Sequence, residues 1–187
     1  MELPRLKDME VHFDGHCFGC GPLNPDGLQL KFEPGPDGSA AEYDVPKRFQ
    51  SWAGMAHGGI VALMLDEAVG WAAWHAGHPG VTGRLQVSLR RPLKLGERIR
   101  IVGKVDHVRR SLVYVSALVE NRDTQSRVAD ATATLMTHFY EGMFKRQLTP
   151  AAALREAQLT MSRRNDGNRH ITGRPSFSRD NTIKKRC

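Results

Sequence analysis

The segment 57–77, HGGIVALMLDEAVGWAAWHAG, constrains the fold of this chain more than any other stretch. Read as a helix, it presents apolar residues on almost every side, and a helix that is hydrophobic all round is buried in a protein core or in a membrane. Asp66 and Glu67 stand in its middle turn. Charges at the centre of a membrane span are costly, so we expect no membrane partner. The segment predicts a long central helix that the rest of the protein surrounds.

Much of the remaining sequence up to residue 144 alternates between apolar and polar residues, a pattern typical of half-buried strands. A short strand is expected at 28–32, and 40–45 is a weaker candidate for its hairpin partner. After the helix, longer strands are expected at 81–91, 97–108, 111–120 and 127–140. Long alternating strands and a single hydrophobic helix predict the α+β class, with a curved antiparallel β-sheet wrapped around one long central helix.

The basic charge of the chain is confined to its C-terminal segment. Residues 145–187 contain 11 Lys and Arg against three acids, a net charge of +8, which leaves −1 for residues 1–144 out of a total of +7. We therefore divide the chain into a folded domain of residues 1–144 and a basic tail of residues 145–187. Apart from a short helix that 150–159 could form, the tail has a composition typical of disorder. It lacks the interleaved aromatic residues of nucleic-acid-binding segments, so nucleic acid is not an expected partner.

The helix carries two features that suit chemistry on a carbonyl group. His57, Gly58 and Gly59 begin it, and backbone N–H groups at a helix start lack partners and favour negative charge. Asp66 follows nine residues after His57, a separation of about 13 Å along the axis. If both ends act on one carbonyl, they must come from different chains across a dimer interface. The alternative is that Gly-Gly only permits a tight turn and that Asp66 is a hydrogen-bonded polar group of the core.

The order of these motifs resembles the hotdog-fold acyl-CoA thioesterases of the PaaI type. HGGIV at 57–61 is followed by LDEA at 65–68, by VTG at 81–83 and by a strand that ends in RRP at 90–92. CFGCG at 17–21 is similar to the N-terminal signature of one subgroup. The resemblance extends over residues 17–140 and implies a hotdog fold, a homodimer or a dimer of dimers, and hydrolysis of acyl-CoA without a cofactor.

The resemblance also implies roles for individual residues. The acid that matches Asp66 acts as general base or nucleophile toward the thioester carbonyl. The N–H that matches Gly58, at the helix start of the partner chain, polarises the carbonyl oxygen, and the residue that matches His57 helps to hold the thioester. The hydroxyl that matches Thr82 lies near the acid or its water, although a β-branched residue is also simply typical of a strand. Gly59 belongs to the same substrate-binding turn.

Four further residues are candidates for substrate contacts. Relatives carry Asn or Gln six residues before the histidine of HGG, where this chain has Ser51 beside Gln50, so we expect one of these two to orient the substrate. Arg84 and Arg91 are expected to meet the phosphates of CoA, because guanidinium groups bind phosphate in a bidentate manner. For each arginine, the alternative is a solvated strand face.

The Cys17-x-x-Cys20 pair has the spacing of half a zinc site. A structural tetrahedral site needs four ligands, and only His12 and His16 lie near in the sequence. We therefore expect no metal and interpret the pair as a tight turn with small buried thiols. A thioredoxin-like redox role lacks the required βαβ context.

The three cysteines do not make a disulfide framework and no signal segment opens the sequence, so a cytoplasmic location is expected. A function of a different class stays open at this point. The chain would then be a non-catalytic, regulatory acyl-CoA-binding hotdog module whose basic tail contacts nucleic acid. A hydratase of the same fold is a third option, but the offset from His57 to Asp66 follows the thioesterase pattern.

Overall fold

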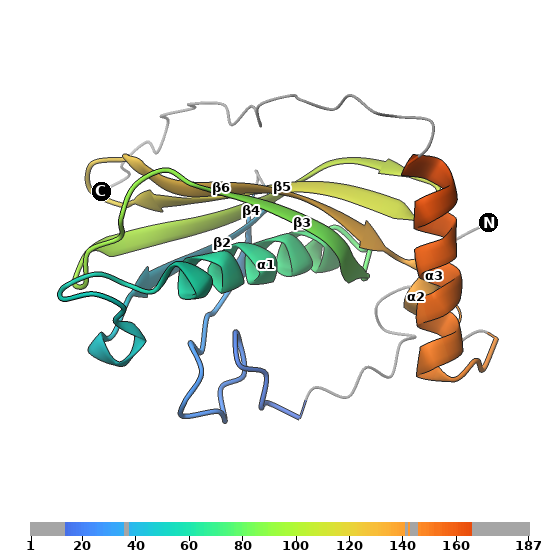
Figure 1. Cartoon of the computed structure of the whole chain (residues 1–187), viewed down its shortest axis with the longest axis horizontal. Helices are drawn as coiled ribbons and strands as arrows, with labels where there is room; N and C mark the ends of the chain where they lie inside the picture. The colour runs from blue at the N-terminus through green and yellow to red at the C-terminus, as the bar shows by residue number, and fades with distance from the viewer. Residues whose placement is uncertain (1–13, 36–37, 141, 143–145, 166–187) are drawn as a thin grey trace, which may run out of the picture.

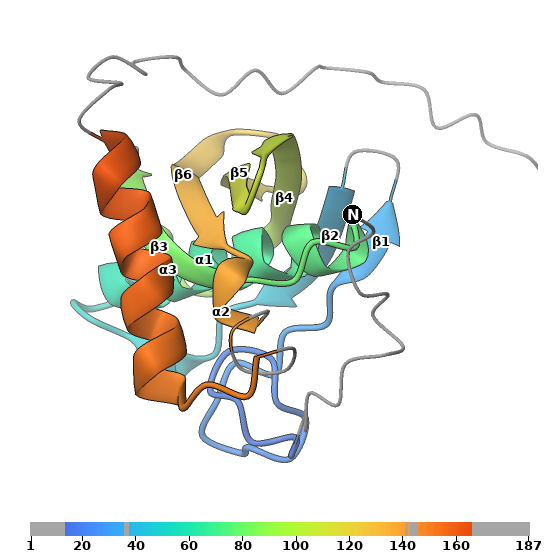
Figure 2. The same ribbon diagram turned by 90° about the vertical axis from the view of Figure 1, so that its right-hand side faces the viewer.

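The computed structural model describes residues 14–35, 38–140, 142 and 146–165, and one long helix, α1 (Gly58–His75), lies against a six-stranded sheet in it (Figure 1). The strands are β1 (Glu33–Gly35), β2 (Gly38–Asp44), β3 (Val81–Leu89), β4 (Arg98–Arg109), β5 (Leu112–Asn121) and β6 (Arg127–Met136). Their order in the sheet is β1-β2-β4-β5-β6-β3, with every neighbouring pair antiparallel. Seen from the side, the sheet curves over α1 (Figure 2). This confirms the predicted antiparallel sheet wrapped around one central helix.

The core lies between α1 and the strands at the middle of the sheet. Ile99 and Ile101 on β4 are fully buried, as their alternation with arginines predicted, and they pack with Met64 and Leu65 of the helix in one hydrophobic cluster. The contact is closest where Gly103 of β4 faces α1. A Cβ atom at this position would lie 2.1 Å from the carbonyl oxygen of Ala68. Glycine is therefore required for the helix to sit this deep in the sheet.

The segment 28–32 is not a strand, and this prediction was wrong. The alternating burial is as expected, because Leu28, Leu30 and Phe32 are buried and the residues between them are exposed. The backbone, however, is irregular, with a positive φ of 54° at Gln29. Its side chains alternate because the segment packs on the face of α1 away from the sheet. The hairpin begins directly after this segment, where β1 pairs with β2.

The C-terminal part of the described chain contains more helix than predicted. β6 ends at Met136 and the short α2 (His138–Tyr140) follows, so the strand expected at 127–140 is shorter than predicted. Further on, α3 (Pro150–Asn165) extends beyond the predicted 150–159 and includes residues 161–165, which were assigned to a disordered tail. Buried Ala157 of α3 packs on Leu112 and Met136 at the end of the sheet. The rest of the predicted tail, 166–187, lies outside the described residues.

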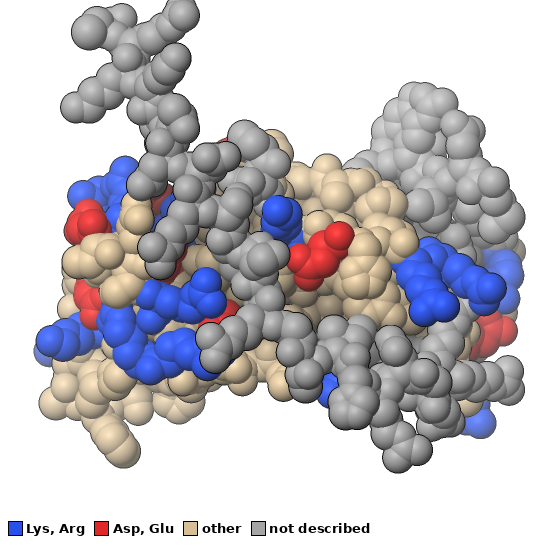
Figure 3. Space-filling model, turned by 90° about the horizontal axis from the view of Figure 1, so that it is seen from above, with Lys and Arg blue, Asp and Glu red and all other residues tan. Residues whose placement is uncertain are grey.

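No helix in the described ranges is both long enough and apolar enough to cross a membrane. The charged side chains of the body are mixed in sign, and Figure 3 shows basic and acidic groups close together on the face seen from above. Arg90 pairs with Asp130 and Arg122 pairs with Glu42. This mixture agrees with the near-neutral charge of residues 1–144.

Replacing Gly103 by alanine is expected to lower the free energy of unfolding by about 1–3 kcal/mol, because the new methyl group forces α1 away from β4. Chemical denaturation measures the change. Gly35→Ala is the matched control, since a Cβ atom there meets nothing within 4 Å. Equal stability of the two variants would contradict the close contact between helix and sheet.

Candidate active site

The middle of α1 and the start of β3 bring the two predicted catalytic side chains together. Thr82 Oγ1 donates a hydrogen bond of 2.9 Å to Asp66 Oδ1. Asp66 is half-buried and Thr82 is exposed, so the carboxylate is reachable from solvent rather than enclosed in the core. The register of β3 against β6 shifts between Thr82 and Arg84, which changes the direction of the strand beside the hydroxyl. Within the described residues, Thr82 is the one hydrogen-bond donor to Asp66.

The start of α1 is built around His57, which caps the helix with an extended backbone. Its carbonyl oxygen accepts hydrogen bonds from the N–H groups of Ile60 and Val61 at 3.0 and 3.3 Å. Its ring Nδ1 accepts the N–H of Gly59 at 2.9 Å, so the neutral ring carries its proton on Nε2. The N–H of Gly58 has no acceptor in the described parts of the chain. One helix-start donor is therefore left for an external oxygen atom.

Within one chain these two features stay apart. His57 and Asp66 are separated by nine residues of continuous helix, or about 13 Å of axial rise. No kink or break in α1 brings these two residues closer, because the helix is continuous from Gly58 to His75. Within one chain, the helix start and Asp66 are therefore too far apart to contact the same small group.

β3 ends the sheet on the side opposite β1, and its outer edge carries no further strand among the described residues. Leu89 on this strand is 56% exposed. It lies beside the helix start, since a Cβ atom on Gly58 would be 3.1 Å from Leu89 Cδ1. An open strand edge is a ready surface for pairing with another chain.

The loop before α1 carries the predicted substrate-orienting pair. Gln50 Oε1 accepts the N–H of Gly54 at 3.2 Å, and the backbone N–H of Ser51 donates to Met55 at 2.8 Å. Both side chains are exposed, and the adjacent Trp52 is 78% exposed. The loop is tied to the helix start because the N–H of His57 donates to the carbonyl of Phe49 at 2.9 Å. The structure thus places Gln50 and Ser51 at the His57 end of the helix rather than at the Asp66 end.

The two predicted phosphate-binding arginines differ in their surroundings. Arg84 lies exposed on β3, two residues beyond Thr82. Arg91 is instead held by Glu97, with two hydrogen bonds of 3.1 and 2.8 Å, and it also donates to Ser126. These contacts favour a structural role for Arg91 and leave Arg84 the more available cation.

Glu97 is the acceptor that fixes Arg91 in place. Its carboxylate also accepts the backbone N–H of Lys94 and the side-chain amide of Asn121. The hydrogen bonds from Arg91 lower the pKa of Glu97 from its ordinary 4.5 to about 2, against the effect of partial burial. The turn after β3 is therefore held by an ionised carboxylate with four donors.

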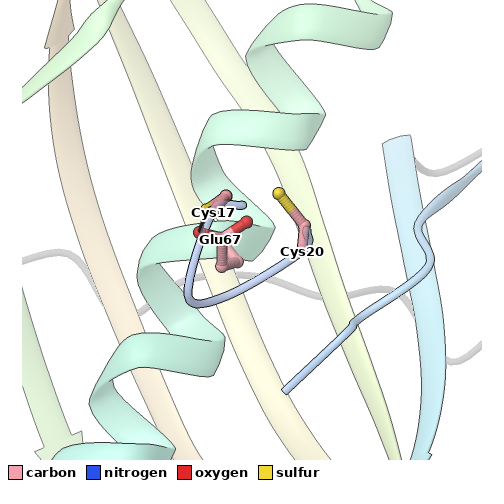
Figure 4. A group of neighbouring side chains, drawn as sticks. All are labelled: Cys17, Cys20 and Glu67. Carbon is pink, nitrogen blue, oxygen red and sulfur yellow. Dashed lines mark hydrogen bonds between the residues drawn. The ribbon is translucent and has the colours of Figure 1, made fainter. Parts of the chain in front are cut away.

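Cys17 and Cys20 lie beside Glu67, a contact that the spacing of residues in the sequence did not predict. Figure 4 shows Cys17 and Cys20 on one loop beside Glu67 of α1, and their three ligand atoms lie within 4.8 Å of one another. Burial raises the pKa of the Cys20 thiol, and its hydrogen bond with Glu67 raises it further. Glu67 lies fifty residues from Cys17 in the chain, and no local pattern connects them.

A profile of the thioesterase superfamily matches residues 53–128, from the loop before α1 to the start of β6. This part of the chain, less than half of its length, is similar to the thioesterase superfamily. The sheet and its central helix match the hotdog fold of solved thioesterase-superfamily structures.

Three solved structures illustrate the similarity. The thioesterase superfamily protein RHA08564 is 24% identical, with a TM-score of 0.62, and the match covers 65% of this chain but only 60% of that one. The Streptococcus mutans protein smu.793, bound to acetyl CoA, is 24% identical over 57% of this chain and 86% of its own, with a TM-score of 0.54. A hypothetical thioesterase from Streptococcus pneumoniae TIGR4, with coenzyme A, is 24% identical over 57% and 84%, with a TM-score of 0.53.

Replacing Glu97 by glutamine is expected to lower the free energy of unfolding by about 1–2 kcal/mol at neutral pH, because charge-assisted hydrogen bonds are lost. The folded-state pKa lies below the unfolded value, so this stabilisation is present above pH 4.5 and disappears as the pH falls toward 2. Urea denaturation over this range should show the variant and the native protein converging. Glu33→Gln, on the exposed β1, is the control. A constant difference at all pH values would argue against the ion pair.

Proposed function

We propose that this protein hydrolyses acyl-CoA thioesters to the free acid and CoA, at two equivalent sites across a homodimer interface. The observation that carries the proposal is the accessible Asp66–Thr82 pair on a chain whose free helix-start donor lies about 13 Å away. Thioester hydrolysis needs both a carboxylate and a donor to the carbonyl oxygen, and within one chain these two groups are too far apart to act together. A two-fold axis supplies both complements at once.

The proposed reaction uses Asp66 in one of two ways. As a general base, its carboxylate takes a proton from water while the water oxygen attacks the thioester carbon. As a nucleophile, it attacks that carbon itself and forms an anhydride that water then opens. In both cases the carbon–sulfur bond breaks and CoA leaves as the thiol or thiolate. Thr82 is a positioning residue in this scheme, because its hydroxyl holds one carboxylate oxygen and leaves the other free.

The negative charge that develops on the carbonyl oxygen needs donors that are already oriented. The partner chain's Gly58 offers a backbone N–H without a competing acceptor, at the positive end of an 18-residue helix. His57 fixes this turn through its bond to Gly59 and keeps Nε2–H as a second donor for the thioester. Gln50 and Ser51 lie at the same end and are available to orient the acyl group.

The dimer is proposed to form along β3. Its open edge and its exposed Leu89 would be covered by the same strand of a second chain, which extends the sheet through the interface. This arrangement brings the Asp66 of one chain toward the helix start of the other. Arg84, on the same strand, is placed to meet the phosphates of CoA. A dimer of dimers would keep these sites intact.

The solved relatives support the choice of substrate. One was crystallised with acetyl CoA and another with coenzyme A. Alanine variants of the pneumococcal protein replace an aspartate and a threonine 16 residues apart. Asp66 and Thr82 are 16 residues apart as well. The finer PaaI-type assignment and a cytoplasmic location remain predictions, and a nucleic-acid role for residues 166–187 concerns residues outside the described ranges.

Asp66→Asn is expected to lower kcat/KM by about 10²–10⁴-fold, because the amide can neither accept the proton nor attack the thioester. Release of free thiol from a panel of acyl-CoAs measures the loss. Asp44→Asn, at the end of β2, is the control and should keep full activity. Intact turnover in Asp66→Asn would overturn the proposal. No turnover by the native protein with CoA binding preserved would favour a non-catalytic binding module.

Gly58→Pro tests the helix-start donor without removing a side chain. Proline is well tolerated at the first helical position, and the extended backbone of His57 suits the residue before it. The missing N–H should lower kcat by about 10²–10³-fold. Gly58→Ala is the matched control, because it adds a Cβ atom near Leu89 but keeps the N–H. Equal activity of the two variants would remove Gly58 from the mechanism.

Mixing the two inactive variants tests whether the site is shared. In a heterodimer of Asp66→Asn and Gly58→Pro chains, one site carries both changes and the other carries neither. Random re-association should therefore restore about a quarter of the native activity per chain, since half of the dimers hold one intact site. Native mass spectrometry counts the heterodimers. A mixture as inactive as its components would place both groups in one chain's site.

A further inference from the structure

The loop that carries Cys17 and Cys20 brings three potential metal ligands to one point on the outer side of α1. The two sulfur atoms and a carboxylate oxygen of Glu67 lie within 4.8 Å of one another, and Cys17 Sγ is 3.5 Å from Glu67 Oε1. Ligand atoms around a tetrahedral zinc ion, with bonds of about 2.0–2.3 Å, are roughly 3.5–3.8 Å apart. The 3.5 Å between Cys17 Sγ and Glu67 Oε1 matches that spacing.

The backbone of the loop is shaped for this approach. The N–H of Gly21 donates to the carbonyl of Cys17 at 2.9 Å and closes the turn. A Cβ atom on Gly19 would lie 2.2 Å from Glu67 Oε1, and one on Gly21 would lie 2.5 Å from the nitrogen of Cys17. Both glycines are therefore needed for the thiols to lie against the carboxylate. A hydrogen bond of 2.8 Å from Leu28 to Phe18 fixes the loop further.

The charge balance at this point also favours a cation. Glu67 is half-buried in a helix that is otherwise largely apolar, and no Lys or Arg in the described part of the chain lies within ion-pair distance of it. Its polar partners are thiols, which are weak donors. A half-buried carboxylate without a counter-charge is unfavourable. A divalent cation would supply the missing charge.

We propose that Cys17, Cys20 and Glu67 bind a thiophilic divalent cation of the zinc type, with water as the fourth ligand. The two thiols release their protons to solvent when the sulfur–metal bonds form, and no oxidation takes place. The water position is open because Cys17 is exposed. The ion would join the N-terminal loop to α1, on the side of the helix away from the sheet.

A reactive dithiol is the competing interpretation of the same pair. The thiolate is the nucleophile in disulfide exchange, and reactive cysteines lie in electropositive surroundings. Cys17 and Cys20 instead lie beside the Glu67 carboxylate, and no Lys or Arg of the described residues pairs with that carboxylate. The surroundings therefore suit a ligand that a metal deprotonates better than they suit a free redox thiol.

Cobalt and zinc titrations of the full-length, reduced, chelator-treated protein test the proposal. Co²⁺ should produce thiolate-to-cobalt charge-transfer absorption that saturates at about one equivalent per chain and is bleached by Zn²⁺. Cys17→Ser and Cys20→Ser should abolish this absorption, and Glu67→Gln should weaken binding about tenfold or more. Cys187→Ser, which removes the third cysteine, is the control and should bind normally.

Several results would overturn the assignment. These are absence of the charge-transfer band, its persistence in both cysteine variants, unchanged affinity in Glu67→Gln, or a Cys17–Cys20 disulfide in protein kept under reducing conditions. Zn²⁺ should also protect two thiols of the unmodified chain from a thiol reagent, a readout that needs no variant to fold. None of these measurements uses a thioester, so their failure would leave the proposed hydrolysis untouched.

Discussion

The structure depends on how closely α1 can be approached from two sides. On the sheet side, Gly103 lets β4 touch the backbone of Ala68, and on the other side Gly19 lets the N-terminal loop touch Glu67. At both places a methyl group would overlap an oxygen atom. The helix is therefore held between two layers at van der Waals distance, and its apolar side chains are removed from water by both. Its two central acids are consequently directed to different sides, Asp66 toward β3 and Glu67 toward the cysteine loop.

The length of the helix has a second consequence for function. A rigid α1 keeps its positive end and Asp66 about 13 Å apart, and no loop movement shortens a continuous helix. A chemical step that needs both must therefore recruit a second chain, and the open edge at β3 is where the sheet offers one a place. In the proposed reaction, the dimer and the active site therefore follow from the same geometric constraint. The exposed Leu89 lies where that edge and the helix start meet.

The sequence was sufficient where a regular pattern reports local geometry. The all-round apolar character of 57–77 predicted α1, and strict alternation predicted β4 and β5 to within one or two residues. The strand predicted at 28–32 was wrong. Buried and exposed residues alternate there because the segment packs on α1, and it does not pair with a neighbouring strand. The contact of Asp66 with Thr82 followed from a family resemblance, whereas Glu67 was missed. Its meeting with Cys17 depends on how a distant loop folds over the helix, and no local spacing encodes that.

Glu97 and Asp130 accept more hydrogen bonds than the two carboxylates of the candidate sites. Glu97 receives four hydrogen bonds, two of them from Arg91, which fills the acceptor positions of a carboxylate. Asp130 is bound by both donor arms of Arg90. Asp66 receives one hydroxyl, and Glu67 has only thiols, within the described residues. A folded chain satisfies half-buried carboxylates wherever it can, because unpaired ones are costly. The two acids of the apolar helix α1 therefore have acceptor positions free, and the two proposals assign these positions to a thioester with its water and to a cation.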